Sequence, residues 1–137
     1  MKTLFDAQPS QTNLPITERV KSFEDACKVL GMSKIELGTS GLNEDEVSII
    51  AYAKLVIIAR ALNEGWKPDW SNSNQVKYIP WFKHNAASGF GLSFDDFGYW
   101  NSHSYVGSRL CFKDRDRAKY CFNTFLQLWE DYFLIDK

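Results

Sequence analysis

The chain has 137 residues, of which 45% are hydrophobic and 15% aromatic, and its formal net charge is −1. This length suits a single domain with one apolar core. A net charge near zero excludes a protein-wide basic field of the kind that drives non-specific nucleic-acid binding. Residues 76–119 nevertheless contain seven basic and four acidic side chains, so a modest positive excess coincides with the most aromatic stretch.

The domain organisation and compartment follow from a few simple features. Residues 1–16 are polar, include two prolines and predict a flexible arm in front of a single domain over residues 17–137. Cys27, Cys111 and Cys121 have no paired spacing, which predicts free thiols in a reducing, cytoplasmic compartment. No apolar run approaches the roughly 18 residues of a membrane span, so we expect no contact with a membrane.

Two helices are predicted in the first half of the chain. Ser22 is a suitable N-cap for a short helix that Gly31 ends. Asn43 begins a longer helix and, with Glu46 at the third helical position, predicts a capping box. Apolar residues then occupy nearly every face as far as Leu62, which is typical of a helix in the middle of a domain.

Three strands are predicted between this helix and the C-terminal part of the chain. Residues 76–83 alternate with period two, and Pro80 among them predicts an edge strand or a bulged strand. Residues 90–95 and 106–112 alternate in the same way and predict a second and a third strand. Residues 96–105 are rich in glycine, asparagine, serine and aromatic side chains, which predicts a long turn or exposed loop.

The end of the chain predicts one more long helix. Apolar residues recur at three- and four-residue steps from Ala118 to Phe133, and Asp114 is the expected N-cap. The predicted fold class is therefore α+β, with a small antiparallel sheet of about three strands packed against two long helices and a short N-terminal helix.

Four segments also resemble a known family. ALNEGWKPDW, KYIPWF, SGFG and VGSRLCFK stand at residues 61–70, 77–82, 88–91 and 106–113. They resemble small uncharacterised proteins encoded by tailed phages and mobile elements of gut anaerobic bacteria, over about residues 17–135. The resemblance implies a phage or mobile-element origin and a place in the host cell or the virion. Because no activity is assigned to that family, it implies no functional residues.

The sequence carries no recognised catalytic or metal-binding motif. Cys111 and His103 would suit a thiol nucleophile and its base, but Cys111 stands in an apolar strand pattern without an oxyanion-hole motif. Asp95 and Asp96, with His84 or His103, lack a recognised ligand spacing. We therefore expect no catalytic residue, no metal and no cofactor, and an enzyme with an unrecognised site ranks third among the functional hypotheses.

One face of the predicted sheet is the candidate binding surface. If the side chains of Val76, Tyr78 and Phe82 pack on the helices, the reverse face displays basic and aromatic residues, joined by aromatics of the neighbouring loop. Such a surface is typical of a protein interface, and also of single-stranded nucleic-acid binding. We expect a non-enzymatic interaction module that binds a protein partner or self-associates, with single-stranded nucleic acid as the alternative. The predicted binding residues are Lys77, Trp81, Lys83, Tyr99, Trp100 and Arg109.

Overall fold

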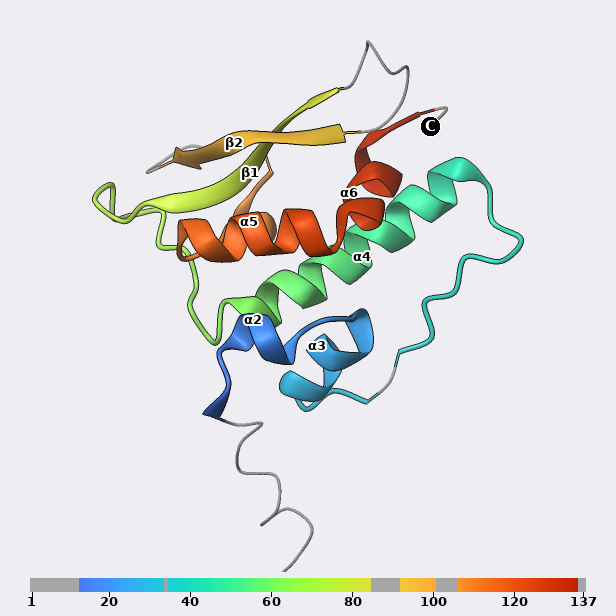
Figure 1. The fold of residues 1–137 in the computed structure, drawn as a ribbon, viewed down its shortest axis with the longest axis horizontal. Helices are drawn as coiled ribbons and strands as arrows, with labels where there is room; N and C mark the ends of the chain where they lie inside the picture. The colour runs from blue at the N-terminus through green and yellow to red at the C-terminus, as the bar shows by residue number, and fades with distance from the viewer. Residues whose placement is uncertain (1–12, 34, 85–91, 101–105, 136–137) are drawn as a thin grey trace, which may run out of the picture.

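A computed structural model of the chain describes residues 13–33, 35–84, 92–100 and 106–135, and for residues 81–84 and 92–100 it describes the backbone alone. Its elements in chain order are α2 (Ile16–Arg19), α3 (Phe23–Val29), α4 (Glu44–Leu62), β1 (Lys77–His84), β2 (Leu92–Trp100), the 3-10 helix η2 (Ser108–Leu110), α5 (Arg115–Thr124) and α6 (Leu126–Phe133). The fold is mainly helical. Figure 1 shows α4 running through the middle, with α2 and α3 on one side, α5 and α6 on the other, and the two strands beyond α5.

The two predicted helix starts in the first half of the chain are confirmed. The Ser22 side chain accepts a hydrogen bond from the backbone N–H of Asp25 at 3.0 Å. At the start of α4, the Asn43 side chain accepts from the Glu46 N–H at 2.8 Å, and the Glu46 carboxylate accepts from the Asn43 N–H at 3.0 Å. Beyond α4, Gly65 adopts a φ of 87°, a conformation that glycine tolerates without steric cost, and turns the chain away from the helix.

The helices share one apolar core. Leu55, Ile58 and Leu62 of α4 are fully buried at its centre, together with side chains from the helices on both sides. Burial of this kind is the main favourable contribution to folding. Ile16 belongs to the same cluster and is 4% exposed, so the last residue of the predicted N-terminal arm packs into the body. The division into an arm and a single domain otherwise stays a prediction, because most of the arm lies outside the described residues.

The predicted three-stranded sheet, and with it the α+β fold class, is wrong. In the described part of the chain the sheet has two strands, β1 and β2, which pair in antiparallel orientation. The register shifts between Trp81 and Phe82, one residue beyond Pro80, in agreement with the edge or bulged strand that the proline predicted.

The predicted third strand, residues 106–112, is a turn followed by η2. Gly107 has a φ of 74°, which interrupts an extended conformation. The short helix η2 begins at the next residue, where the strand was predicted to continue. Phe112 alone forms an antiparallel bridge with Tyr78, through backbone N···O distances of 3.0 and 2.7 Å. The alternation in the sequence therefore arose from Leu110 and Phe112, which are both fully buried, and not from a strand.

The predicted loop over residues 96–105 is also corrected. Residues 96–100 belong to β2, where Tyr99 and Trp100 pair with the first residues of β1. Aromatic side chains favour strands, and here that preference outweighs the glycine and asparagine content of the segment. Residues 101–105 of this predicted loop lie outside the described residues.

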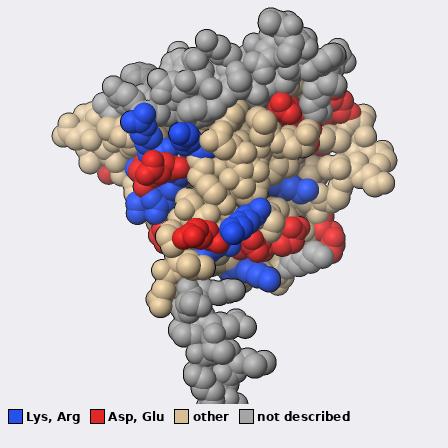
Figure 2. All heavy atoms as spheres, in the orientation of Figure 1, with Lys and Arg blue, Asp and Glu red and all other residues tan. Residues whose placement is uncertain are grey.

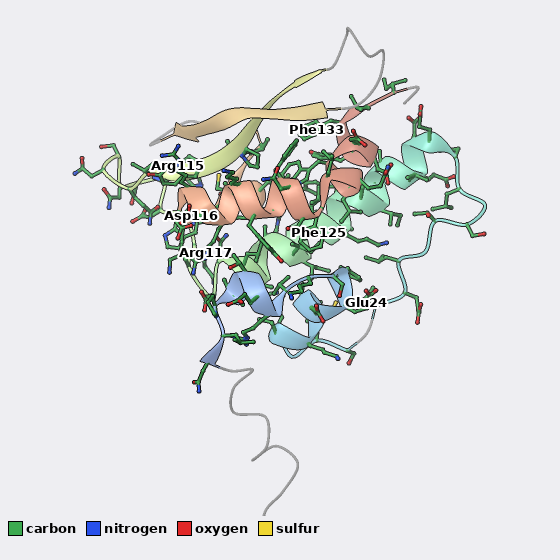
Figure 3. The ribbon with its side chains drawn as sticks, in the orientation of Figure 1. Glu24, Arg115, Asp116, Arg117, Phe125 and Phe133 are labelled. Atoms are coloured by element: carbon green, nitrogen blue, oxygen red, sulfur yellow. The ribbon has the colours of Figure 1, made fainter. Side chains whose placement is uncertain are left out.

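The predicted long C-terminal helix is two helices. Asp114 caps the first, as predicted, and accepts a hydrogen bond from the Arg117 N–H at 2.9 Å. The break falls at Phe125, whose φ and ψ are −114° and 34°. Figure 3 labels Phe125 at this junction and Phe133 at the far end of α6. Because α5 packs against the strands while α6 packs along α4, one straight helix would not reach both partners.

Candidate functional site

A cleft of about 910 Å³ lies beside the second half of α4. Ligand pockets commonly have volumes of roughly 300–1,000 Å³, so its size suits a small ligand or part of a peptide. The cleft brings together four segments that are distant in the sequence: the end of α3, α4, the loop that follows α4, and the turn that leads into η2. Its lining residues are Leu30, Tyr52, Val56, Arg60, Asn63, Gly65, Trp66, Lys67, Pro68, Val106, Gly107, Ser108 and Arg109.

The charged residues of the cleft are all basic. Arg60 comes from the last turn of α4, Lys67 from the following loop and Arg109 from η2, and all three are exposed. None of the described lining residues is acidic. Cations gathered in a concave surface attract anionic groups more strongly than the same cations spread over a convex one. The cleft therefore favours a ligand with negative charge.

The rest of the lining is largely apolar or aromatic. Leu30, Val56 and Val106 are half-buried, and so are the rings of Tyr52 and Trp66. Partial exposure leaves apolar surface that a ligand can cover, and covering it contributes about 25 cal/mol per Å². The cleft thus combines apolar surface with cations in one concavity.

A hydrogen bond from Trp70 joins two of the segments that form the cleft. The indole N–H of Trp70 donates to Ser108 Oγ at 2.5 Å, linking the loop after α4 to the start of η2. The Trp70 ring also contacts Lys77, whose Nζ lies 5.0 Å from the ring centroid and donates to the Asn72 carbonyl oxygen at 3.0 Å. A cation over an indole face is stabilising, more so when it is removed from water.

Asn63, at the end of α4, forms hydrogen bonds with the segment that follows η2. Its side chain is buried, with Nδ2 donating to the Cys111 carbonyl oxygen at 2.9 Å and Oδ1 accepting from the Lys113 N–H at 3.0 Å. Both ends of the amide are therefore satisfied, as a buried polar group requires. This side chain holds residues 111–113, which directly follow η2 and its Arg109, against the end of α4.

Arg117 of α5 binds the C-terminal end of α4. Its Nε donates to the Leu62 carbonyl oxygen at 2.7 Å, and its guanidinium forms ion pairs with Asp114 and with Glu64, the latter at 2.5 Å. Figure 3 shows Arg117 beside Asp116 and Arg115 at the start of α5. Glu64 follows the cleft residue Asn63 directly in the sequence, and its carboxylate is engaged by Arg117.

Of the six predicted binding residues, the structure describes the side chains of two, Arg109 and Lys77. Arg109 is exposed and lines the cleft. Lys77 is fully buried, and Ile79, two residues further on, is 3% exposed, so the expectation that this side of β1 forms an open face is wrong at these positions. The other four, Trp81, Lys83, Tyr99 and Trp100, lie in the strands with only their backbone described.

Sequence reasoning missed most of the cleft. Arg60 is an exposed cation on a helix that was expected to be buried all round, and this exception was the available signal. Trp66, in the loop after α4, lines the cleft with a half-buried ring. Lys67 gave no signal, because its role depends on contacts far away in the sequence.

The candidate catalytic and metal-binding groups gain no support. All three cysteines are free and buried, as predicted, and Cys111 Sγ donates to the Gly107 carbonyl oxygen at 3.1 Å. Burial raises the pKa of Cys121 to about 12, which keeps this thiol protonated and unreactive at neutral pH. His103 lies outside the described residues, and only the backbone of residues 84, 95 and 96 is described. Within the described residues, no group of three or more histidine, cysteine or acidic side chains is placed to hold a metal ion.

The chain matches no protein-family model, no curated protein and no solved structure. The resemblance to phage and mobile-element proteins, and the host-cell or virion setting that it implies, therefore stay predictions. Among the helices of the described residues, none combines the length and apolar character needed to cross a membrane.

Proposed function

We propose that this protein is a non-enzymatic interaction module whose cleft receives a segment of a protein partner. The supporting observation is the composition of the cleft, which combines apolar and aromatic side chains with three exposed cations, and whose described lining includes no acidic residue. A protein segment with an apolar side chain flanked by carboxylates matches both properties. The apolar group covers the exposed part of the lining, and the carboxylates lie near the cations.

The apolar part of the lining favours protein over nucleic acid. Leu30, Val56, Pro68 and Val106 provide surface for an aliphatic or aromatic side chain. Single-stranded nucleic acid binds through a basic groove that follows several nucleotides and through stacked bases. A cleft bounded on several sides suits one inserted side chain better than an extended strand.

Single-stranded nucleic acid is the second candidate because of one specific observation. The half-buried rings of Tyr52 and Trp66 line the same cleft as Arg60, Lys67 and Arg109. Rings beside cations provide stacking for a base and charge for a phosphate, and each stacked base contributes about 1–3 kcal/mol.

Fluorescence anisotropy with two labelled probes tests the proposal. One probe is a short peptide with isoleucine between aspartate and glutamate residues, and the other is an oligothymidylate of similar net charge. We expect the peptide to bind more tightly, and Arg109→Ala to weaken it at least about fivefold, as loss of an interface residue worth about 1 kcal/mol does. Arg115→Ala, which removes an exposed arginine from the start of α5, is the matched control and should bind like the wild type.

The two probes also separate the alternatives. Tighter binding of oligothymidylate, with a steep loss of affinity as salt rises, would favour the nucleic-acid function. Binding of neither probe, or equal effects of the Arg109 and Arg115 substitutions, would contradict a function based on this cleft.

A further inference from the structure

The start of α4 presents an acidic, apolar surface that matches the cleft in charge and character. Glu44, Asp45 and Glu46 form the first turn of α4, and Ile49 follows one turn later with 67% of its surface exposed. Ile49 is the most exposed large apolar side chain within the described helices. Residues four apart lie on the same helix face, so Asp45 and Ile49 are neighbours. We call Asp45, Glu46 and Ile49 the acidic tip.

Within the acidic tip, Asp45 is the carboxylate best placed for an external contact. The Glu46 carboxylate already accepts the Asn43 N–H in the capping box, whereas Asp45 is exposed on the side of Ile49. Figure 2 shows acidic side chains at the edge of the molecule where α4 begins. The tip therefore offers an aliphatic side chain beside a carboxylate, the combination that the cleft favours.

We infer that the cleft of one copy receives the acidic tip of a second copy. The inference rests on the proposed function and names the partner. Its basis is charge complementarity, with Asp45 and Glu46 on one surface against Arg60, Lys67 and Arg109 on the other, and apolar side chains at the centre of both. Complementary charges of this kind select the partner and its orientation.

The acidic tip and the α4 wall of the cleft belong to one rigid helix, so the two surfaces can meet only between different molecules. α4 has 19 residues and so is about 28 Å long at 1.5 Å per residue. The acidic tip lies at its N-terminal end and Arg60 in its last turn, and Figure 1 shows the two ends on opposite sides of the molecule. A chain therefore cannot place its own tip in its own cleft. Association is head-to-tail and leaves one free tip and one free cleft on each dimer.

Sedimentation velocity over a range of concentrations and salt tests this association. We expect the wild type to form dimers and larger species as its concentration rises, and fewer of them at high salt because exposed charges are screened. Asp45→Lys and Arg109→Glu should each weaken association at least about tenfold, because each places like charges together. Glu24→Lys is the matched control for the tip, since Glu24 is also an exposed acid in the first turn of a helix. Arg115→Glu is the control for the cleft, and both controls should behave like the wild type.

Mixing the two variants tests the head-to-tail arrangement itself. Asp45→Lys keeps an intact cleft and Arg109→Glu keeps an intact tip, so a mixture should form assemblies that contain the two variants in alternation and in equal number, although neither variant associates alone. The double variant carrying both changes should regain self-association, because lysine and glutamate exchange places across the interface. Failure of both the mixture and the double variant, with all variants folded by circular dichroism, would overturn the inference.

The inference and the proposed function fail in different ways. A wild type that stays monomeric at every concentration, while the acidic peptide still binds in an Arg109-dependent manner, overturns self-association and leaves the protein-binding cleft in place. A monomeric wild type that binds neither peptide nor oligothymidylate overturns both. Self-association that is equally sensitive to the Glu24 and Asp45 substitutions overturns the assignment of the tip.

Discussion

Asn63 is the residue on which one wall of the cleft most directly depends. Its buried amide pairs with the Cys111 carbonyl and the Lys113 N–H, about fifty residues away along the chain. Asn63→Ala would leave both backbone groups without this partner. Because an unpaired buried group costs about 1–3 kcal/mol, we expect the free energy of unfolding to fall by at least about 2 kcal/mol in urea denaturation.

Asn123→Ala is the control for this prediction. Asn123 is exposed in α5, so its replacement should change the free energy of unfolding by no more than about 0.5 kcal/mol. Equal effects of the two substitutions would mean that the bonds made by Asn63 add nothing to stability.

The raised pKa of Cys121 predicts how the stability of the fold changes at alkaline pH. Its side chain is fully buried, and burial raises its pKa from the ordinary 9.0 to about 12. Between these values the folded state keeps a proton that the unfolded state loses, so stability falls as the pH rises through this window. We expect Cys121→Ala to lose less stability than the wild type between pH 9.0 and about 12, measured as the urea midpoint at each pH.

The wild type and Cys121→Ala are compared by the slope of the urea midpoint against pH, because the substitution also removes packing and so lowers stability at every pH. Burial raises the pKa of Tyr120 and Tyr132 as well, so part of the alkaline loss should remain in the variant. Identical slopes for the two proteins would contradict a role for the Cys121 thiol.

At the scale of elements, Phe125 joins α5 to α6 and sets their directions. It is 8% exposed, and its ring lies edge-on to Tyr120 with the centroids 6.5 Å apart. Phe125→Ala would remove this ring from the core, and large-to-small changes at buried phenylalanines cost about 3–5 kcal/mol. We expect a loss of that size in the free energy of unfolding, measured by urea denaturation.

Gln127→Ala provides the reference for the Phe125 prediction. Gln127 is exposed in α6 and bonds only to Asp131 among the contacts described for its side chain, at 2.9 Å. Its replacement should change stability by a few tenths of a kcal/mol. If Phe125→Ala lowered the unfolding midpoint no further than Gln127→Ala, the junction would not be part of the core.

At the scale of the whole molecule, the net charge conceals how the charges are arranged. The formal total is −1, yet α4 carries three carboxylates in its first turn and contributes a cation to a basic cleft near its end. Figure 2 shows basic and acidic side chains close together over much of one face. Interspersed charges cancel at a distance, so the separation along α4 is the arrangement that can orient a partner.

The sequence by itself determined the features that depend on residues close together in the chain. The caps of α3, α4 and α5 were predicted correctly because Ser22, Asn43 and Asp114 bond to backbone groups three residues away. The same holds for the disturbed strand at Pro80, whose ring removes a backbone donor whatever surrounds it.

Only the tertiary structure decided which surfaces are buried and which segments meet. Lys77 was expected on an open face and is buried under Trp70, and residues 106–112 alternate in sequence without forming a strand. Of the two predicted binding residues whose side chains the structure describes, Arg109 lines the cleft with Arg60 and Lys67, and Lys77 does not. Burial and charge clustering depend on partners tens of residues away, and the periodicity of one segment carries no information about which side of it another segment will cover.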